Sequence, residues 1–257
     1  PVKVETRPAA LRLNYGPSLL EQEPVSEPDK EVIRVDNLRS EKELARSIGS
    51  RVPFFSYASE ERFRDLFTAL NEDATTNTNY VVFMLLSTLI ASLGLFLDSA
   101  AVIIGAMILA PLMAPMVSVS MALLRDNNKL LRQSLEKIGL GVALALLAAA
   151  TTSAMFPHSP TTSEMLGRLS PSLPDLFVAI LSGIAAAYAR SYKEIAQNLA
   201  GVAIAVALVP PLSVAGIGLG RGDMVFFLQA FLLFSTNLVG IVLAATLTFR
   251  VLGFSAS

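Results

Sequence analysis

The strongest constraint in this sequence is a series of long apolar segments that begins at Tyr80 and is almost free of charged residues. A helix needs about 20 consecutive apolar residues to cross the hydrocarbon core of a bilayer. Six segments approach or exceed that length. They are residues 80–97, 100–124, 138–156, 175–190, 198–219 and 224–249. The sequence therefore predicts an all-α integral membrane protein with six transmembrane helices.

The chain before Tyr80 has a different character, because it holds more than half of the 20 Lys and Arg residues. Residues 1–58 are predicted to be a short, mostly irregular cytoplasmic segment or the remnant of a soluble domain. Residues 59–79 are predicted to form an amphipathic juxtamembrane helix and a hinge, since apolar residues from Phe63 to Leu70 recur at helical spacing. We expect this helix to lie along the membrane face or to pack under the bundle. The membrane domain then extends over residues 80–257.

Lys and Arg residues in short loops indicate how a membrane protein is oriented. With the N-terminus inside, two basic residues fall in the outer loops, Arg168 and Arg221, whereas nine flank the inner ends. The nine are Arg62, Arg64, Arg125, Lys129, Arg132, Lys137, Arg190, Lys193 and Arg250. Both termini are therefore expected to be cytoplasmic.

Prolines interrupt two of the predicted spans. Pro111 and Pro115 lie in the second span, and Pro210 and Pro211 lie in the fifth. Proline has no N–H, so it frees a carbonyl one turn earlier in the helix. In hydrocarbon a free carbonyl is tolerated only where protein buries it or where it lines a wet cavity. Half-helix ends at such breaks offer amide groups to anions and carbonyls to cations.

The two broken spans superpose when the sequence is shifted by 100 residues. Four positions between Val102 and Leu112 then carry identical residues. Matching spans are three spans apart, and this odd number reverses their direction across the bilayer. The sequence predicts two inverted three-helix repeats, 80–156 and 175–249, a plan that many secondary transporters share. The alternative is two unrelated hairpins that each tolerate proline.

Polar residues accompany the breaks and complete a predicted solute-binding set. The set is Pro111, Pro115, Ser118, Pro210, Pro211, Ser213, Thr236 and Asn237. Asn237 is the costliest of these to bury, so we expect it to meet either a substrate or a partner helix. Asp98 is predicted to cap the second span or to handle an ion, and Asn198 occupies the matching position. The proline breaks themselves either bind the solute or only shape the packing.

Several classes of function have no support in the sequence. The chain has no Cys, so disulfides and thiolate sites are excluded, and His158 is the only His. No nucleophile and base arrangement, paired buried carboxylates or phosphate-binding loop occurs. A net charge of −1 gives no basic surface for nucleic acid. We therefore expect no enzyme, no metal site, no cofactor and no nucleic-acid partner.

Three apolar segments of the chain have distinctive sequences: "AAVIIGAMILAPLMAPMVSVSMAL", "GVAIAVALVPPLSVAGIGLG" and "TNLVGIVLAATL". They resemble the hallmark segments of a widespread bacterial and archaeal family of hydrophobic membrane proteins, catalogued as domain of unknown function three-eight-nine. The resemblance covers about Tyr80 to Phe249. It implies a multi-span domain in a prokaryotic cytoplasmic (inner) membrane, often preceded by a small soluble domain. It implies no particular substrate.

Two functions are compatible with these observations. In the first, a transporter or channel-like protein moves a small solute or ion through a site at the paired breaks. In the second, a structural or signalling module oligomerises and anchors an N-terminal cytoplasmic domain. The near absence of buried charge disfavours a proton relay of carboxylates. Stretches of small residues are plentiful, so a homo-oligomer in the lipid bilayer is expected.

Overall fold

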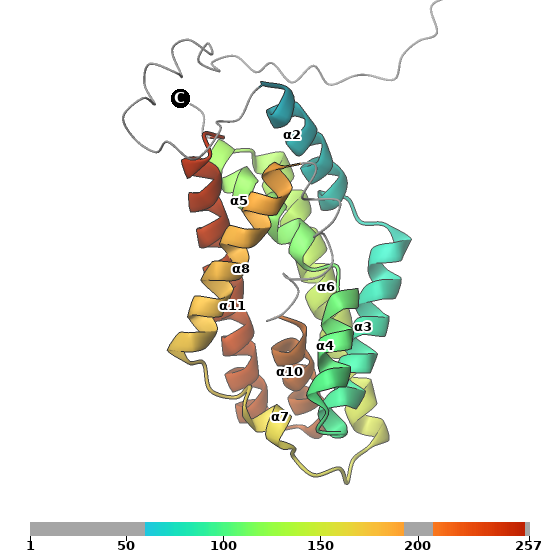
Figure 1. Ribbon diagram of the computed structural model, residues 1–257. Coiled ribbons are helices and arrows are strands. Elements are labelled where there is room, and N and C mark those ends of the chain that lie inside the picture. Colours follow the sequence, from blue (N-terminus) through green and yellow to red (C-terminus); the bar gives the residue numbers. More distant parts are fainter. Residues whose placement is uncertain (1–59, 193–207, 255–257) are drawn as a thin grey trace, which may run out of the picture. The chain divides into compact units, whose positions relative to one another are not determined.

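A computed structural model of the chain describes residues 60–192 and 208–254 (Figure 1). All regular structure in these two ranges is helical. The helices are α2 (Glu60–Ala74), α3 (Thr78–Phe96), α4 (Ala100–Leu109), α5 (Met113–Arg125), α6 (Asn128–Met155), α7 (Ser163–Leu166), α8 (Leu173–Ser191), α10 (Val209–Arg221) and α11 (Met224–Val251). The predicted segment 1–58 and Asn198 lie outside the described residues.

Four of these helices are long and apolar enough to cross a membrane, namely α3, α6, α8 and α11. Helices α4 and α5 would form a fifth span as a pair bent by 55°. The predicted fifth span, 198–219, is described only from Leu208 onward. An all-helical protein of membrane type is therefore confirmed, whereas the number of six spans stays a prediction.

Side-chain caps set the starts of the long helices. The side-chain oxygens of Asn77, Asn127 and Asp223 each accept a hydrogen bond from the amide three residues on, at 2.8, 2.9 and 3.0 Å. Such caps satisfy amides that have no partner within the helix. Because Asn127 is a cap, α6 begins at Asn128, well before the predicted span start at residue 138. Its polar first turns precede the apolar segment from which that span was predicted.

The bend between α4 and α5 follows from Pro111. The residue before a proline is driven to extended backbone, and Ala110 has φ −74° and ψ 121°. Its amide donates to the carbonyl of Met107 at 3.2 Å, one residue closer than in an α-helix. The carbonyl of Ala106 instead accepts the hydroxyl of Ser87 from α3 at 2.7 Å. A carbonyl at the break is thus satisfied by the neighbouring helix.

The other prolines do not interrupt a helix in the described residues, which corrects the expectation for Pro115. Pro115 is the third residue of α5, and Pro210 and Pro211 are the second and third residues of α10. Amides in the first turn have no acceptor within the helix, so proline costs little there. These three prolines therefore belong to the starts of short buried helices.

The helices of the two predicted halves match in length. Helices α3 and α8 have 19 residues each, α5 and α10 have 13, and α6 and α11 have 28. A shift of 96 residues carries α5 and α6 onto α10 and α11, and a shift of 95 carries α3 onto α8. These shifts replace the predicted 100. In Figure 1 each helix runs in the direction opposite to its match.

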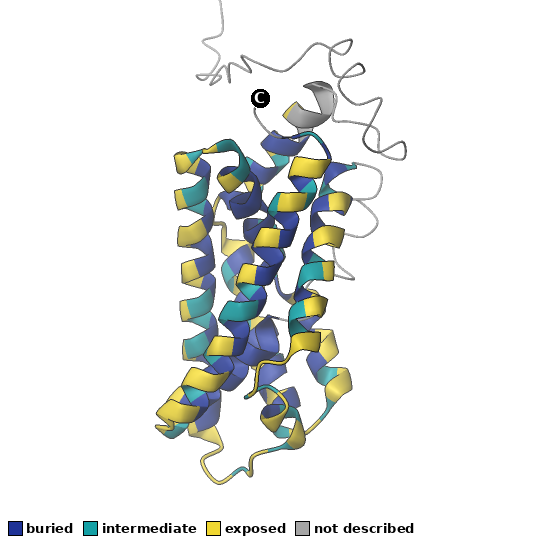
Figure 2. Ribbon diagram, turned by 90° about the vertical axis from the view of Figure 1, so that its left-hand side faces the viewer, coloured by how far each residue is buried: buried dark blue, intermediate teal, exposed yellow. Residues whose placement is uncertain are grey.

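Packing crosses between the halves. Helix α10 packs against α6 as well as α11, and α5 packs against α11 as well as α6. Figure 2 shows the resulting pattern, with buried residues along the inner faces of the helices and exposed residues on the outer faces. Every residue of α10 from Val209 to Gly218 is buried. The start of α10 therefore lies deep inside the bundle.

Candidate solute site at the start of α10

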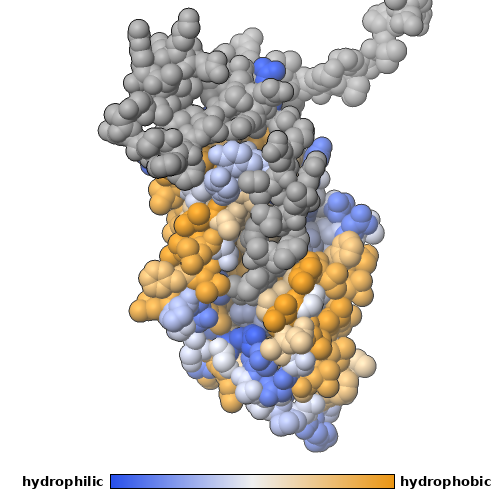
Figure 3. Space-filling view, in the orientation of Figure 1, coloured by the Kyte–Doolittle hydropathy of each residue, from blue (hydrophilic) through white to orange (hydrophobic). Residues whose placement is uncertain are grey.

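A cavity of about 290 Å³ lies between α8, α10, α11 and the end of α7. Its lining residues are Gly167, Arg168, Asp175, Val178, Pro210, Pro211, Leu233 and Asn237. Figure 3 shows hydrophilic residues near α7 on a face whose two sides are hydrophobic. The cavity therefore connects a polar patch with the buried start of α10.

Asn237 supplies a polar side chain deep in this cavity. It is 2% exposed and lines the cavity together with Pro210 and Pro211. A primary amide both donates and accepts hydrogen bonds, so it suits an uncharged or a charged polar solute. Of the residues predicted to bind a solute, these three are brought together by the structure.

The start of α10 presents few backbone donors. Of its first three residues, Val209 has an N–H but Pro210 and Pro211 have none. The amide of Leu212 donates to the carbonyl of Leu208 at 3.3 Å. A helix start normally binds anions through several unpaired amides. The prolines remove most of these donors, so side chains supply most of the polar groups here, in contrast to the backbone site that the sequence predicts.

Two opposite charges line the same cavity. Nη1 of Arg168 donates to the carbonyl and, at 2.6 Å, to the carboxylate of Glu164. Oδ2 of Asp175 accepts from the amide and hydroxyl of Ser172 at 3.0 and 2.5 Å, in a capping box for α8. Sequence reasoning missed both residues, because they lie in or next to the loop between α6 and α8, far along the chain from the prolines. The one signal in the sequence that could have identified them is the pair of opposite charges next to a predicted span.

The other predicted residues lie elsewhere. The hydroxyl of Ser118 donates to the carbonyl of Leu70 in α2 at 3.0 Å. Pro111 is half-buried at the bend, and Pro115 is buried in α5. Ser213 is buried in α10, and its hydroxyl has no hydrogen-bond partner in the described ranges. None of these four residues lines the cavity.

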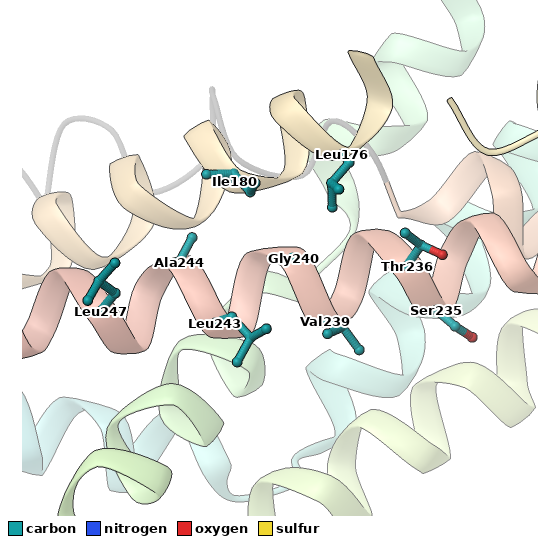
Figure 4. A pocket seen from close by; sticks show the side chains of 9 residues that line it. All are labelled: Leu176, Ile180, Ser235, Thr236, Val239, Gly240, Leu243, Ala244 and Leu247. Atoms are coloured by element: carbon teal, nitrogen blue, oxygen red, sulfur yellow. The ribbon is translucent and has the colours of Figure 1, made fainter. Parts of the chain in front are cut away.

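Thr236 belongs to a second, apolar hollow of about 650 Å³ between α8 and α11. Figure 4 shows Leu176 and Ile180 of α8 on one side and the α11 residues from Ser235 to Leu247 on the other. The hydroxyl of Thr236 donates to the carbonyl of Leu232 at 2.8 Å, so its polarity is satisfied within α11. An exposed apolar hollow of this kind suits contact with lipid chains rather than a polar solute.

Apolar side chains join the two half-helix starts. One core cluster contains residues from the bend and from the start of α10. They include Ala110, Leu112, Met116, Leu208, Val209 and Leu212. The sequence predicts that the two breaks meet and form one polar site. Among the described residues their shared surface is apolar, and the polar cavity adjoins α10 alone.

Asp98 does not cap the second span. Helix α4 follows Ser99 without a side-chain cap. The Asp98 carboxylate accepts instead from the Ser163 hydroxyl at 2.7 Å and from the Glu164 amide at 2.9 Å, at the start of α7. The bond from the Glu164 amide, followed by that from the Ser163 hydroxyl, holds the pKa of Asp98 below its ordinary value. Asp98 therefore ties the start of α7 to the turn between α3 and α4.

Comparison with known proteins agrees with this description. The family described as "Domain of unknown function (DUF389)" matches residues 107–243, more than half of the chain. The chain is also 27% identical over 191 residues to "Uncharacterized protein MJ0678" of Methanocaldococcus jannaschii. That match covers 74% of this chain and 59% of the relative, so the chain spans about three fifths of the relative's length. No solved structure matches the chain.

The matched region contains α5, α6, α8, α10 and the larger part of α11, and with them the cavity and its prolines. Of these helices, α6, α8 and α11 are long and apolar enough to cross a membrane, and α5 belongs to the bent pair with α4. The chain is a helical membrane protein that belongs to the DUF389 family.

Proposed function

We propose that the chain is a transporter or channel-like protein that moves a small solute or ion across a prokaryotic cytoplasmic membrane. The observation that carries this proposal is the polar cavity that reaches Asn237 and the proline-marked start of α10 inside the helical bundle. Polar groups are expensive inside a membrane protein and mark pathways for solutes. The cavity is the outer part of the proposed path.

The matched helix lengths support a plan of two inverted repeats. Three pairs of helices have equal lengths and run in opposite directions, and one sequence shift relates two of the pairs. In such a plan, solute sites lie at the interface of the repeats beside discontinuous helices. Together, α4 and α5 form such a discontinuous helix in the first half, and α10 starts inside the second half. Alternating exposure of the two sides then follows from the rocking of one half against the other.

The lining of the cavity indicates the kind of solute. Its volume is at the small end of the roughly 300–1,000 Å³ of ligand sites. Arg168 and Asp175 provide opposite charges and Asn237 a neutral amide, so the cavity suits a small, strongly polar solute. None of the lining residues is a nucleophile with an adjacent base, so we propose translocation without a chemical reaction. The basic residues that end α5 and α8 support a cytoplasmic location for that end of the bundle.

Cysteine labelling tests the proposal, because the natural chain contains no Cys. Single variants Val178→Cys and Leu233→Cys place a thiol in the cavity. Leu243→Cys is the matched control, since Leu243 is 62% exposed on the apolar side of α11. In vesicles, a charged, membrane-impermeant thiol reagent added outside should modify the two cavity variants. It should leave Leu243→Cys unmodified, because a charged reagent does not enter hydrocarbon.

A solute is then sought with the same variants. A library of ions and metabolites is screened for ligands that raise the melting temperature of the purified protein, as any ligand of the folded state does. A ligand that also slows labelling of Leu233→Cys and crosses reconstituted vesicles would establish transport. If the cavity thiols do not react at all, the interior is dry. That result would overturn the proposal and support a structural module.

A further inference from the structure

The repeat relates the outer cavity to a set of residues at the opposite, inner end of the bundle. The shifts of 96 and 95 residues carry the lining residues of α8, α10 and α11 to matches in the first half. The matches include Pro115 for Pro211, Lys137 for Leu233, Gly141 for Asn237 and Tyr80 for Asp175. In a symmetric molecule a second cavity would lie among these four residues.

Tyr80 and Lys137 fill that space instead. Tyr80 is 3% exposed, and its hydroxyl donates to the carbonyl of Lys137 at 2.9 Å. A Cβ atom at Gly141 would collide with this hydroxyl, so the ring is packed directly against α6. The ammonium of Lys137 lies 4.7 Å from the centre of the Tyr80 ring, within the range of a cation–π interaction. Side chains therefore occupy the inner match of the outer cavity.

The end of α2 completes the closure. Nζ of Lys137 donates to the carbonyls of Asp73 and Thr75, both at 2.7 Å. These carbonyls end α2, where a cation is favoured by the helix dipole. Lys137 is 5% exposed although it carries a charge, so these two bonds are its main compensation.

Two further contacts hold α2 in place from other helices. The hydroxyl of Ser118 in α5 donates to the carbonyl of Leu70 at 3.0 Å. Nη2 of Arg190, in the last turn of α8, lies 2.6 Å from Oδ2 of Asp73. The end of α2 is thus bound by both halves of the bundle.

We propose that Tyr80, Lys137 and the end of α2 form an inner gate, and that the described conformation is open to the outside and closed to the inside. The inference rests on the proposed function, because a gate has meaning only on a transport path. Opening requires Lys137 to release the two carbonyls and α2 to move away from α5 and α6.

Single-cysteine reporters in the full chain test the gate from both sides. Ala114→Cys is the inner reporter, because Ala114 is half-buried in α5 and matches Pro210. Leu233→Cys is the outer reporter. The charged thiol reagent should modify Ala114→Cys slowly from the inner side of inverted vesicles. Lys137→Met, which keeps the length of the side chain without its charge, should raise this rate by an order of magnitude. Lys137→Met should also lower the labelling rate of Leu233→Cys from the outside, because it shifts the populations of the two conformations.

Two milder variants guard against a folding defect. Ser118→Ala removes one hydrogen bond to α2, and Tyr80→Phe removes the bond to the carbonyl of Lys137, so each should raise the inner rate severalfold in a well-folded protein. Arg132→Gln is the matched control. Arg132 lies on α6 near Lys137 but is 82% exposed and pairs only with Glu136 within the described ranges. It should change neither rate.

The outcomes separate the gate from the transport path itself. If Leu233→Cys reacts from outside but none of the three variants accelerates Ala114→Cys, the gate is wrong and the path stands. If Ala114→Cys already reacts rapidly in the natural background, the inner side is open and the gate is also wrong. If Leu233→Cys does not react from outside, the proposed path fails, and the gate fails with it.

Discussion

The carboxylate of Asp98 joins the turn between α3 and α4 to the start of α7, and this contact can be tested with a single substitution. It has φ 50°, a left-handed conformation that Asn tolerates as well as Asp does. Asp98→Asn therefore removes the charge without backbone strain. We expect the variant to melt at a lower temperature than the natural protein at neutral pH, because a carboxylate accepts stronger hydrogen bonds from Ser163 and Glu164 than an amide does.

The pH dependence of this difference follows from the sign of the pKa shift. The pKa of Asp98 is lower in the folded protein than its ordinary value of 3.8. Its contribution is therefore present above that value and is lost as the pH falls through the folded pKa. The two melting curves should converge in acid. Asp126→Asn is the matched control, because Asp126 also ends a helix with φ 52°. A difference for Asp98→Asn that stayed constant down to pH 3 would contradict the assignment.

Thr236 and Asn237 show why the site was only partly predictable from single residues. They are neighbours on α11, yet one lines the apolar hollow and the other lines the cavity. Helix α11 is apolar on nearly all sides, so the sequence contains no amphipathic pattern that orients it. Asn237 was identified by the cost of burying its amide. The direction of the Asn237 side chain depends on how α11 packs against α8 and α10. No local signal in the sequence specifies this packing.

At the scale of helices, small residues decide how closely α10 approaches α6. A Cβ atom at Gly216 would lie 2.5 Å from the Cβ of Ala149 and 2.9 Å from the carbonyl of Leu146. Gly216→Ala should therefore push the helices apart and destabilise the protein by about 1–3 kcal/mol, the usual cost of overpacking. Gly139→Ala in α6 is the control, since a Cβ there meets nothing within 4 Å. It should be neutral or stabilising by up to about 1 kcal/mol in thermal unfolding.

Equal gains in stability for the two glycine variants would show that helix propensity, not contact, dominates. Contact is the stronger expectation, because both Gly216 and Gly220 lie against α6 one turn apart. Gly216 and Gly220 thus permit the close approach of α10 to α6. Spacing by four residues is a local signal, so it can be read without knowledge of the partner helix.

The sequence shift between helices of equal length is a different case. Identities among apolar residues favour a shift of 100, since a small alphabet of Ala, Ile, Leu and Val produces chance matches. Helix ends give the shift of 96 instead. Arg125 and Arg221 both end a 13-residue helix, and the residues that follow them both have positive φ. Caps and left-handed ends depend on single polar residues or Gly, so an alignment by apolar identity overlooks them.

At the scale of the whole molecule, Asp73 connects α2 to both halves. Burial raises its pKa above the ordinary value of 3.8, and the charges of Arg190 and Lys137 act against that shift. The pair with Arg190 is close at 2.6 Å but poorly directed as a hydrogen bond. Arg190 and Lys137, from different halves, therefore compensate the partly buried carboxylate of Asp73. Substituting both cations in one variant tests whether the halves are connected through this carboxylate.

Arg190→Gln should cost about 1 kcal/mol at neutral pH, as partly exposed ion pairs usually do. Lys137→Gln should cost about 1–3 kcal/mol, because it removes a buried donor from two carbonyls. The double variant should lose more than the sum, because the carboxylate then has neither of these two compensating cations. A raised folded pKa means that stability is present in acid and is lost as the pH rises through that pKa. The excess loss should therefore grow above about pH 4. When Asp73→Asn is combined with the double variant, the excess loss should disappear at every pH. The measurement is thermal unfolding of the single, double and Asp73→Asn variants. Strict additivity with an unchanged pH profile would mean that α2 is held by carbonyl contacts alone, and the two halves would not be connected through Asp73.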